Sequence, residues 1–538
     1  MNRDTARSMA KRALGQLPLT AELYQRWVAI DRVPPHGFAL ERLEDALPGW
    51  VAAASTARSL ASLNEARRVL VMGYLQWWVE YACALSLLLA AMGHETGLAF
   101  LPYRRWTGQV QPFDLRRQRA YMLRVLGQAG SLLRLHDLST TSPKSLPAEL
   151  LRELKLLSRI DVQYTLQREE IEIGNGGADE ALYRLRLTRN QAAAAAAVEL
   201  LGREDYQVVI IPNGSILEFG AVYRAARHLE VPVVTYEFGE QRQRMWLAQD
   251  DEVMRLDTSG LWQARADLPL TEAETEAVRT LNAAREGATE WSNFARRWQA
   301  RSTKGAGKVR RELELDDSRP LVLLCTNVVG DSLALGREVF TRGMADWLSL
   351  TVKHLGARPD VQLVVRVHPG ELLGAGHPSM DILRAAYPEL PDQVRAVPPE
   401  SDISTYDLIE LADVGLVYTT TVGLEMAMKG IPVIVAGQAH YRGKGFTYDP
   451  EDRRDYLETL DQLLADPERL RLGEGQVELA WRYAYRFFFE FPFSFPWHLV
   501  RFWEDMAKRP FEDLVKDGGA MPYTRTVRAL VGHPISLN

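Results

Sequence analysis

The sequence predicts an α/β protein with two doubly wound domains. Three observations support this prediction. First, the chain has 538 residues, which is more than one hydrophobic core usually holds. Second, short runs of apolar and β-branched residues alternate with helical segments in two separate stretches of the chain. Third, apolar runs such as VQLVVRV are continuous, which is typical of parallel strands covered on both faces.

The first predicted strand and helix come from a long apolar run at residues 69–92, which contains a single charge, Glu80. The run is long enough to cross a membrane. However, Gly73 and Glu80 fit poorly in a lipid-facing helix. The favoured interpretation is therefore a buried strand followed by a buried helix at 77–92, the start of a βαβ unit.

Further strands follow the same pattern, and together they define the domains. Predicted strands lie at 69–74, 97–101, 208–211, 231–236, 321–326, 361–367, 414–418 and 433–435. Predicted helices of the second domain lie at 338–355, 406–412 and 422–429. The organisation is a helical N-terminal appendage (1–60), a first Rossmann-like domain (61–265), a helical linker (266–312), a second Rossmann-like domain (313–480) and an aromatic C-terminal segment (481–538).

The C-terminal segment is dense in aromatic residues between positions 481 and 497. Such a segment is able to bind a membrane surface. The favoured interpretation is a helix and a turn that pack across the two domains as buried core.

Composition and charge narrow the class of protein. Hydrophobic residues make up 46% and charged residues 25% of the chain, as in soluble globular proteins. The formal net charge is -6, so no overall basic character points to a nucleic-acid partner. The two cysteines, Cys83 and Cys325, are too few for a disulfide framework or a cysteine-rich zinc site. Residues 1–17 lack the apolar core of a signal peptide. We expect a cytoplasmic, metal-independent protein.

The first candidate site lies where the strand at 361–367 ends. Open α/β sheets bind ligands beyond the carboxyl ends of their strands. His368 precedes Pro369, which favours an extended backbone at the histidine. Arg366 lies two residues earlier, so both side chains point to the same side. They could bind a phosphate together, although His368 could also be a structural loop residue.

A second candidate site follows the strand at 414–418. Thr420 and Thr421 precede a predicted helix, whose first N–H groups attract anions. Glu425 would lie one turn into this helix. The simpler alternative is a threonine cap with a first-turn glutamate. Gly423 favours a ligand site, because a glycine there permits close approach of a ligand.

Loops after other strands add further candidates. The Gly-rich, basic loop at 437–446 contains Lys444 and could close over a phosphate or form a flexible surface loop. In the first domain, Glu237 and Glu240 follow the strand at 231–236, where a general base or nucleophile is expected. Either glutamate could instead pair with Arg242 or Arg244.

A polar stretch after the strand at 208–211 is interpreted as structural. Ser215 is expected to cap the next helix, with Glu218 as its capping-box partner.

Residues 361–450 resemble the capsule polysaccharide biosynthesis glycosyltransferases, a group that includes bacterial transferases of 3-deoxy-manno-octulosonic acid (Kdo). The resemblance extends to the acidic-plus-glycine element at Glu237-Phe238-Gly239 and to a C-terminal helix around 485–489. The features that carry it are His368-Pro369, Tyr406-Asp407-Leu408-Ile409, Ala412-Asp413, Thr420-Thr421-Val422-Gly423-Leu424-Glu425, Gly430-Ile431-Pro432-Val433, Tyr441 and Gly445.

This resemblance implies a GT-B fold, in which two Rossmann-like domains face a cleft and the C-terminal one holds a nucleotide sugar. The implied activity is transfer of a sugar from a nucleotide-sugar donor to a surface or capsular glycan, free or lipid-linked. The expected location of the protein is the cytoplasm or the inner face of the membrane. No other cofactor is implied, and a CMP-sugar is one candidate donor. A sugar-nucleotide epimerase, a polyol-phosphate transferase and a non-catalytic nucleotide- or glycan-binding assembly protein remain alternatives on this scaffold.

The expected mechanism assigns a role to each candidate residue. Glu237 or Glu240 would act as a base toward the acceptor hydroxyl or as a nucleophile. The remaining residues would bind the donor: Thr420, Thr421 and Gly423 its phosphate, Glu425 its ribose, and Arg366, His368 and Lys444 the leaving phosphate.

Overall fold

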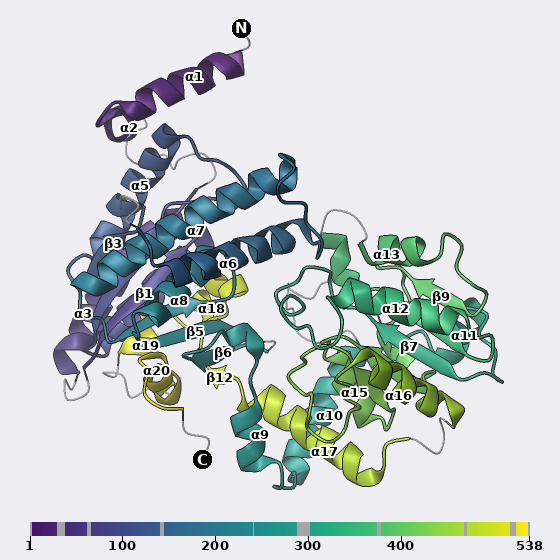
Figure 1. Cartoon of the computed structure of the whole chain (residues 1–538). Coiled ribbons are helices and arrows are strands. Elements are labelled where there is room, and N and C mark those ends of the chain that lie inside the picture. The colour runs from purple at the N-terminus through teal and green to yellow at the C-terminus, as the bar shows by residue number, and fades with distance from the viewer. Residues whose placement is uncertain are drawn as a thin grey trace. The chain divides into compact units, whose positions relative to one another are not determined.

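The computed structural model describes residues 3–28, 38–61, 66–139, 145–239, 241–287, 302–373, 378–466, 471–516 and 523–535. The chain forms two compact units, whose elements are labelled in Figure 1. Unit 1 comprises Met1–Val162, Glu172–Met254 and Phe493–Ser536. Unit 2 comprises Gln163–Ile171, Arg255–Pro492 and Leu537–Asn538.

Unit 1 is built on a seven-stranded sheet in the order β12-β6-β5-β4-β1-β2-β3. Strands β1 to β5 are parallel, β6 runs antiparallel to β5, and β12 runs antiparallel to β6. The strands are β1 (Arg68–Tyr74), β2 (Glu95–Leu101), β3 (Leu133–Asp137), β4 (Val208–Pro212), β5 (Val233–Phe238), β6 (Arg244–Gln249) and β12 (Phe493–Ser494).

Helices cover this sheet. Those of unit 1 are α1 (Arg3–Gln16), α2 (Thr20–Leu23), η1 (Tyr24–Val28), α3 (Glu41–Leu60), α4 (Gln76–Ala91), α5 (Pro112–Leu126), η2 (Gly127–Ala129), α6 (Ala148–Leu166), α7 (Ala178–Arg203), α8 (Leu217–His228), η3 (Val253–Arg255), η7 (Leu499–Arg501), α18 (Phe502–Lys508), α19 (Phe511–Val515) and α20 (Thr524–Leu530). The last turn of α6, from Gln163, and the last residue of η3, Arg255, belong to unit 2.

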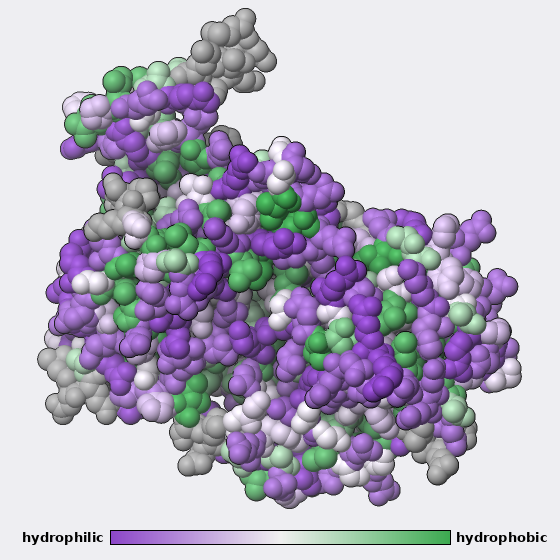
Figure 2. Space-filling view, in the orientation of Figure 1, coloured by the Kyte–Doolittle hydropathy of each residue, from purple (hydrophilic) through white to green (hydrophobic). Residues whose placement is uncertain are grey.

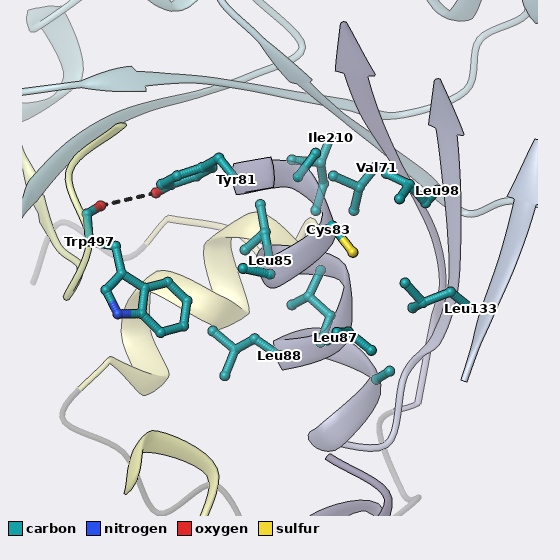
Figure 3. Packing of buried hydrophobic residues seen from close by; sticks show 14 of the residues in the cluster. Val71, Tyr81, Cys83, Leu85, Leu87, Leu88, Leu98, Leu133, Ile210 and Trp497 are labelled. Atoms are coloured by element: carbon teal, nitrogen blue, oxygen red, sulfur yellow. Dashed lines mark hydrogen bonds between the residues drawn. The ribbon is translucent and has the colours of Figure 1, made fainter. Parts of the chain in front are cut away.

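The core of unit 1 is centred on α4, which is buried almost throughout because nearly every side chain in it is apolar. Figure 3 shows Cys83, Leu85 and Leu87 of this helix packed among side chains of the strands, including Val71. The Tyr81 hydroxyl donates a hydrogen bond to the carbonyl oxygen of Trp497, 3.2 Å away. A segment near the end of the chain therefore completes this core.

The apolar run at 69–92 forms a strand and a helix, as predicted. β1 ends at Tyr74, and Leu75 has a positive φ of 63° where the chain turns into α4. No helix in the described part of the chain is long and apolar enough to cross a membrane.

Unit 2 is built on a five-stranded, wholly parallel sheet in the order β11-β10-β7-β8-β9. Its strands are β7 (Leu321–Cys325), β8 (Gln362–Arg366), β9 (Val394–Val397), β10 (Val414–Val417) and β11 (Val433–Val435). Its helices are α9 (Ser259–Arg265), α10 (Glu272–Glu286), α11 (Ala306–Glu312), α12 (Met344–Gly356), η5 (Pro369–Leu373), α13 (Pro378–Ala386), α14 (Thr405–Ile409), α15 (Val422–Met428), α16 (Arg453–Ala465), α17 (Glu474–Tyr485) and η6 (Arg486–Glu490).

The two sheets confirm the predicted α/β class with two doubly wound, Rossmann-like sheets, and every predicted strand is present. Four strands were not predicted: β3, β6, β9 and β12. The helix predicted at 338–355 begins only at Met344, because a carboxylate from elsewhere in the chain caps it there.

The aromatic C-terminal segment divides between the units at residue 493. Its first part forms α17 and η6 in unit 2, where Tyr483 and Phe487 are buried. Its second part joins unit 1, where Phe493, Phe495 and Trp497 are buried in the core. These rings are thus packed inside the protein and do not form an exposed aromatic surface.

Candidate functional site

The carboxyl edge of the unit 1 sheet carries the first candidate site. From β1 the sheet proceeds through β2 and β3 in one direction and through β4 and β5 in the other. Such a reversal marks the position at which open α/β sheets bind ligands. The residues that follow β4 and β5 therefore lie close to the expected ligand position.

Glu237 is one of these residues, and its carboxyl group is buried at the end of β5 with 8% of the residue exposed. Its Oε2 accepts a hydrogen bond from Asn213 Nδ2 at 3.2 Å, and its Oε1 accepts one from the Phe238 backbone N–H at 3.1 Å. Burial raises the pKa of Glu237 to about 7, because the charged form loses its hydration. A carboxyl group with this pKa suits general base catalysis near neutral pH.

The alternative ion pair of Glu237 with Arg242 or Arg244 is wrong. Among the residues that the structure describes, no cation lies within ion-pair distance of Glu237, and Arg244 instead donates to Ser494 Oγ. Glu240 lies outside the described residues, so its predicted role stays a prediction.

The turn after β4 fixes the partner of Glu237. Asn213 and Gly214 both have positive φ, 59° and 81°. The Asn213 N–H donates to the Tyr236 carbonyl at 2.8 Å, which ties the turn to β5. A side chain at Gly214 would meet Thr235 at 2.6 Å, so only glycine fits. Sequence reasoning missed Asn213; the Asn-Gly pair after a buried strand was the available signal.

The predicted capping box of Ser215 and Glu218 is wrong. α8 begins two residues after Ser215, at Leu217, and has no side-chain cap. The Glu218 carboxylate instead accepts hydrogen bonds from the guanidinium of Arg186, whose side chain is fully buried. Arg186 also pairs with Asp161 at 3.2 Å. A buried charge needs a partner of opposite charge, so pairing Glu218 with Arg186 stabilises the protein more than a helix cap at the surface would.

A cavity of about 510 Å³ lies beyond the end of β2 in unit 1. The Arg189 guanidinium lies 4.1 Å from the centre of the Tyr103 ring and donates to the carbonyls of Arg105 and Gly108. The polar lining of the cavity includes Gln109, Glu180, Arg184 and Thr188. Sequence reasoning missed this cavity, because the loop after β2 and α7 are far apart in the chain.

In unit 2, Arg366 and His368 lie at the end of β8, where both were predicted. Arg366 is buried, and its Nη1 donates to the Pro398 carbonyl at 2.8 Å. His368 is half-buried, and its Nδ1 accepts a hydrogen bond from the Gly370 N–H at 2.9 Å. This bond leaves the proton of a neutral imidazole on Nε2, which becomes a hydrogen-bond donor.

The end of β7 contributes two residues that sequence reasoning missed. Thr326 Oγ1 accepts a hydrogen bond from the His368 N–H at 2.9 Å. Asn327 Oδ1 accepts one from the Thr419 N–H at 3.1 Å. The sheet order reverses between β7 and β10, so these residues occupy the equivalent position in unit 2. A polar Thr-Asn pair directly after the apolar strand was the available signal.

Thr420, Thr421 and Gly423 surround the start of α15, as predicted. The Tyr441 hydroxyl donates to the Thr420 carbonyl at 2.6 Å. A Cβ on Gly423 would lie 2.3 Å from this hydroxyl. Gly423 thus makes room for Tyr441, and the predicted space for a ligand beside this glycine is filled. Thr421 is the cap residue, but its side chain makes no capping hydrogen bond.

Glu425 forms a buried ion pair with Arg285 of α10. The Arg285 guanidinium also lies 4.6 Å from the centre of the Phe488 ring. The sequence offered no sign of this partner, because the two residues are 140 positions apart.

Lys444 lies in the predicted loop, with its Nζ 3.4 Å from Ser259 Oγ. Burial lowers the pKa of Lys444, and the nearby Asp257 carboxylate opposes this shift. The loop is packed against the aromatic segment, with the His440 ring 3.8 Å from that of Phe487. The flexible-loop alternative is therefore wrong.

A carboxylate from the first half of the chain caps α12. Glu169 belongs to unit 2, and its two oxygens accept hydrogen bonds from the N–H groups of Met344 and Ala345 at 2.8 and 2.9 Å. Negative charge is stabilised at a helix N-terminus. Glu169 thereby anchors residues 163–171 to unit 2.

The predicted residues thus fall into two sets. In unit 2, Arg366 and His368 lie at the end of β8, Thr420, Thr421, Gly423 and Glu425 follow β10, and Lys444 lies in the loop after β11. Glu237 belongs to unit 1. Within the described ranges, no group of three or more histidine, cysteine or acidic side chains could hold a metal ion.

Comparison with known proteins supports the resemblance of the C-terminal half. Residues 279–464 match the family model of the capsule polysaccharide biosynthesis protein, which confirms the resemblance found at 361–450. No curated protein matches the chain.

Similar solved structures include two transferases and an epimerase. The KpsC β-Kdo 2,7-transferase of Thermosulfurimonas dismutans is 14% identical, with 53% of this chain and 79% of that chain covered and a TM-score of 0.32. The β-Kdo 2,4-transferase of the same KpsC is 18% identical, with 52% and 80% covered and a TM-score of 0.33. UDP-GlcNAc 2-epimerase from Neisseria meningitidis is 13% identical, with 77% and 94% covered and a TM-score of 0.25.

Proposed function

We propose that the protein is a glycosyltransferase that moves a sugar from a nucleotide-sugar donor to a glycan acceptor during synthesis of a capsular or surface polysaccharide. The observation that carries this proposal is the match of residues 279–464 to the capsule biosynthesis family. The matched region contains Arg366, His368, Thr420, Thr421 and the other unit 2 candidates, at the strand ends where a nucleotide would bind.

The proposed reaction begins with the acceptor hydroxyl. Glu237, as a carboxylate, takes the proton while the acceptor oxygen attacks the anomeric carbon of the donor. The bond between this carbon and the phosphate oxygen breaks, and the nucleotide leaves as an anion. The pKa of about 7 and the hydrogen bond from Asn213 support this role.

The hydrogen-bond donors at the unit 2 edge would stabilise the leaving nucleotide. His368 is proposed to donate from Nε2 to a phosphate oxygen, because its Nδ1 is occupied by the Gly370 N–H. Lys444 is proposed to supply a positive charge, and its lowered pKa reflects a site that is partly shielded from water. Such donors act on the charge that develops at the leaving group.

The first test is thermal stabilisation of the purified protein by CMP, CDP, UDP and GDP. A nucleotide that binds the native state raises the melting temperature by mass action, here by at least about 2 °C at saturation. His368→Ala should abolish this shift. His354→Ala is the matched control, because His354 lies near the C-terminal end of α12 and pairs with Asp461 of α16, away from the carboxyl ends of the strands. The absence of a shift with every nucleotide would contradict the proposal.

Turnover separates the proposed activity from its alternatives. With the stabilising nucleotide carried as a sugar conjugate, a transferase consumes the donor only when a glycan acceptor is present. Conversion of the sugar nucleotide without an acceptor would identify an epimerase. Binding without any turnover would identify a nucleotide-binding assembly protein.

A further inference from the structure

The N-terminal end of unit 1 exposes an unusual concentration of large hydrophobic side chains. Of the thirteen large hydrophobic residues that are exposed in the described part of the chain, six lie between positions 14 and 27. Leu19 and Trp27 are 64% and 74% exposed. We call these six residues the N-terminal apolar surface: Leu14, Leu17, Leu19, Leu23, Tyr24 and Trp27. Figure 2 shows hydrophobic surface over the end of α1 and over α2.

This surface contains a groove of about 560 Å³, which four of its residues line together with Thr20 and Phe113. The hydroxyl groups among the residues that line the groove are those of Thr20 and Tyr24. The Thr20 hydroxyl already donates within the segment, toward the carbonyls of Leu14 and Leu17. The groove therefore offers apolar contact. Clustered apolar surface of this kind marks an interaction site.

The exposed charged residues between positions 10 and 27 have one sign. Arg12 and Arg26 are exposed. Between residues 10 and 27 the only acidic residue is Glu22, which is part-buried and paired with Arg116. The Asp114 carboxylate on α5 likewise forms an ion pair with Lys11, at 2.7 Å. The surface presented to a partner is thus apolar and positive.

We propose that the N-terminal apolar surface binds an anionic lipid membrane. Leucine and tryptophan side chains beside arginine are the composition of segments that lie in the membrane interface. The arginines would face lipid phosphates while the apolar side chains enter the acyl boundary. A second copy of the chain fits less well, because a symmetric contact would bring Arg12 and Arg26 against like charges. This inference does not depend on the proposed enzymatic activity.

Vesicle co-sedimentation of the full chain tests the proposal. Vesicles of phosphatidylcholine alone are compared with vesicles that contain about a third phosphatidylglycerol. We expect the protein to sediment with the anionic vesicles. The double variant Arg12→Glu, Arg26→Glu should bind them at least about 25-fold more weakly, from roughly fivefold per arginine. Leu19→Ser and Trp27→Ser should each weaken binding about tenfold.

Matched variants control for a general loss of hydrophobicity. Leu156 on α6 is 64% exposed, as is Leu19, and Trp77 is 59% exposed. Leu156→Ser and Trp77→Ser should bind the anionic vesicles as the unaltered protein does. All variants are checked for an unchanged melting temperature.

Three results would overturn the proposal: no sedimentation with either vesicle, equal binding by all four serine variants, or a dimer in light scattering that Leu19→Ser dissociates while vesicle binding is absent. The last result would assign the surface to a second copy of the chain.

Discussion

The carboxyl edges of the two sheets are built from similar elements, but the buried glutamate at each edge has different partners. At the unit 1 edge, Glu237 is buried with an amide and a backbone N–H as partners. At the unit 2 edge, Glu425 is neutralised by Arg285, and Arg366 donates to a carbonyl. A buried carboxyl group without a cation is poised to exchange a proton. A buried ion pair holds its elements in place. Substitution of the glutamate should therefore lower the rate of turnover at the unit 1 edge and the stability of the protein at the unit 2 edge.

The largest expected effect is on turnover. Glu237→Gln should lower the rate of sugar transfer about 10²- to 10⁴-fold, because an amide cannot accept the acceptor proton. The measurement is the steady-state rate with donor and acceptor at saturation.

Glu80 provides the matched control for this variant. It is similarly buried in unit 1, burial raises its pKa to about 7, and it accepts a hydrogen bond from Trp503 Nε1 at 3.0 Å. Glu80→Gln should leave the rate nearly unchanged. Equal losses in the two variants would show that Glu237 acts through folding and not as a base.

A loss of stability is expected at the unit 2 edge. Glu425→Ala should reduce the free energy of unfolding by about 3–5 kcal/mol, because it breaks the buried ion pair with Arg285. Denaturant unfolding measures this change. Lys429→Ala is the control, since its exposed pair with Glu286 joins the same region to α10 and should contribute about 0–1 kcal/mol. Similar losses in both variants would refute the contrast between the pairs.

The stability of unit 1 should fall as the pH rises. The pKa values of Glu237 and Glu80 in the folded protein, about 7, lie above the ordinary 4.5, so the folded state binds the proton more tightly. Each group contributes stability that is fully present below pH 4.5 and is lost as the pH rises through 7, on the order of 3 kcal/mol.

The glutamine variants remove this dependence one group at a time. Unfolding free energies measured at pH 5 and pH 8 should differ less in Glu237→Gln and in Glu80→Gln than in the unaltered protein. A pH dependence that neither substitution changes would contradict the burial argument.

The smallest expected effect concerns the cap of α12. Glu169→Ala should reduce the free energy of unfolding by about 1–2 kcal/mol, because two N–H groups lose their acceptor. Glu170→Ala, at the exposed neighbouring position, should change it by less than about 0.5 kcal/mol. Thermal unfolding of the two variants in parallel makes the comparison, and an equal shift would argue against the cap.

The sequence predicted the strands whose side chains are buried on both faces, such as β1 and β8, because their apolar runs are continuous. It did not predict β6 and β9, which are only partly buried and carry polar residues such as Arg244 and Arg395. Neither strand stands out by composition, and each is defined by pairing with its neighbour.

The candidate site was predictable to a similar extent. Strand ends located Glu237, Arg366 and His368, since a strand end in a parallel sheet determines where the next residue lies. Their partners were not predictable. The contact of Asn213 with Glu237 depends on a turn with two positive φ angles, and the contact of Arg285 with Glu425 depends on how distant helices pack.

The interrupted path of the chain through unit 1 has a consequence for biosynthesis. A ribosome that reaches residue 492 has made the full length of Arg255–Pro492, but unit 1 still lacks β12 and the helices after it. Until then β6 has an open edge and α4 lacks the cover of Trp497. Domains generally fold in the order in which they are synthesised. In this protein the sequence of Arg255–Pro492 is therefore available to fold before unit 1 has all of its strands.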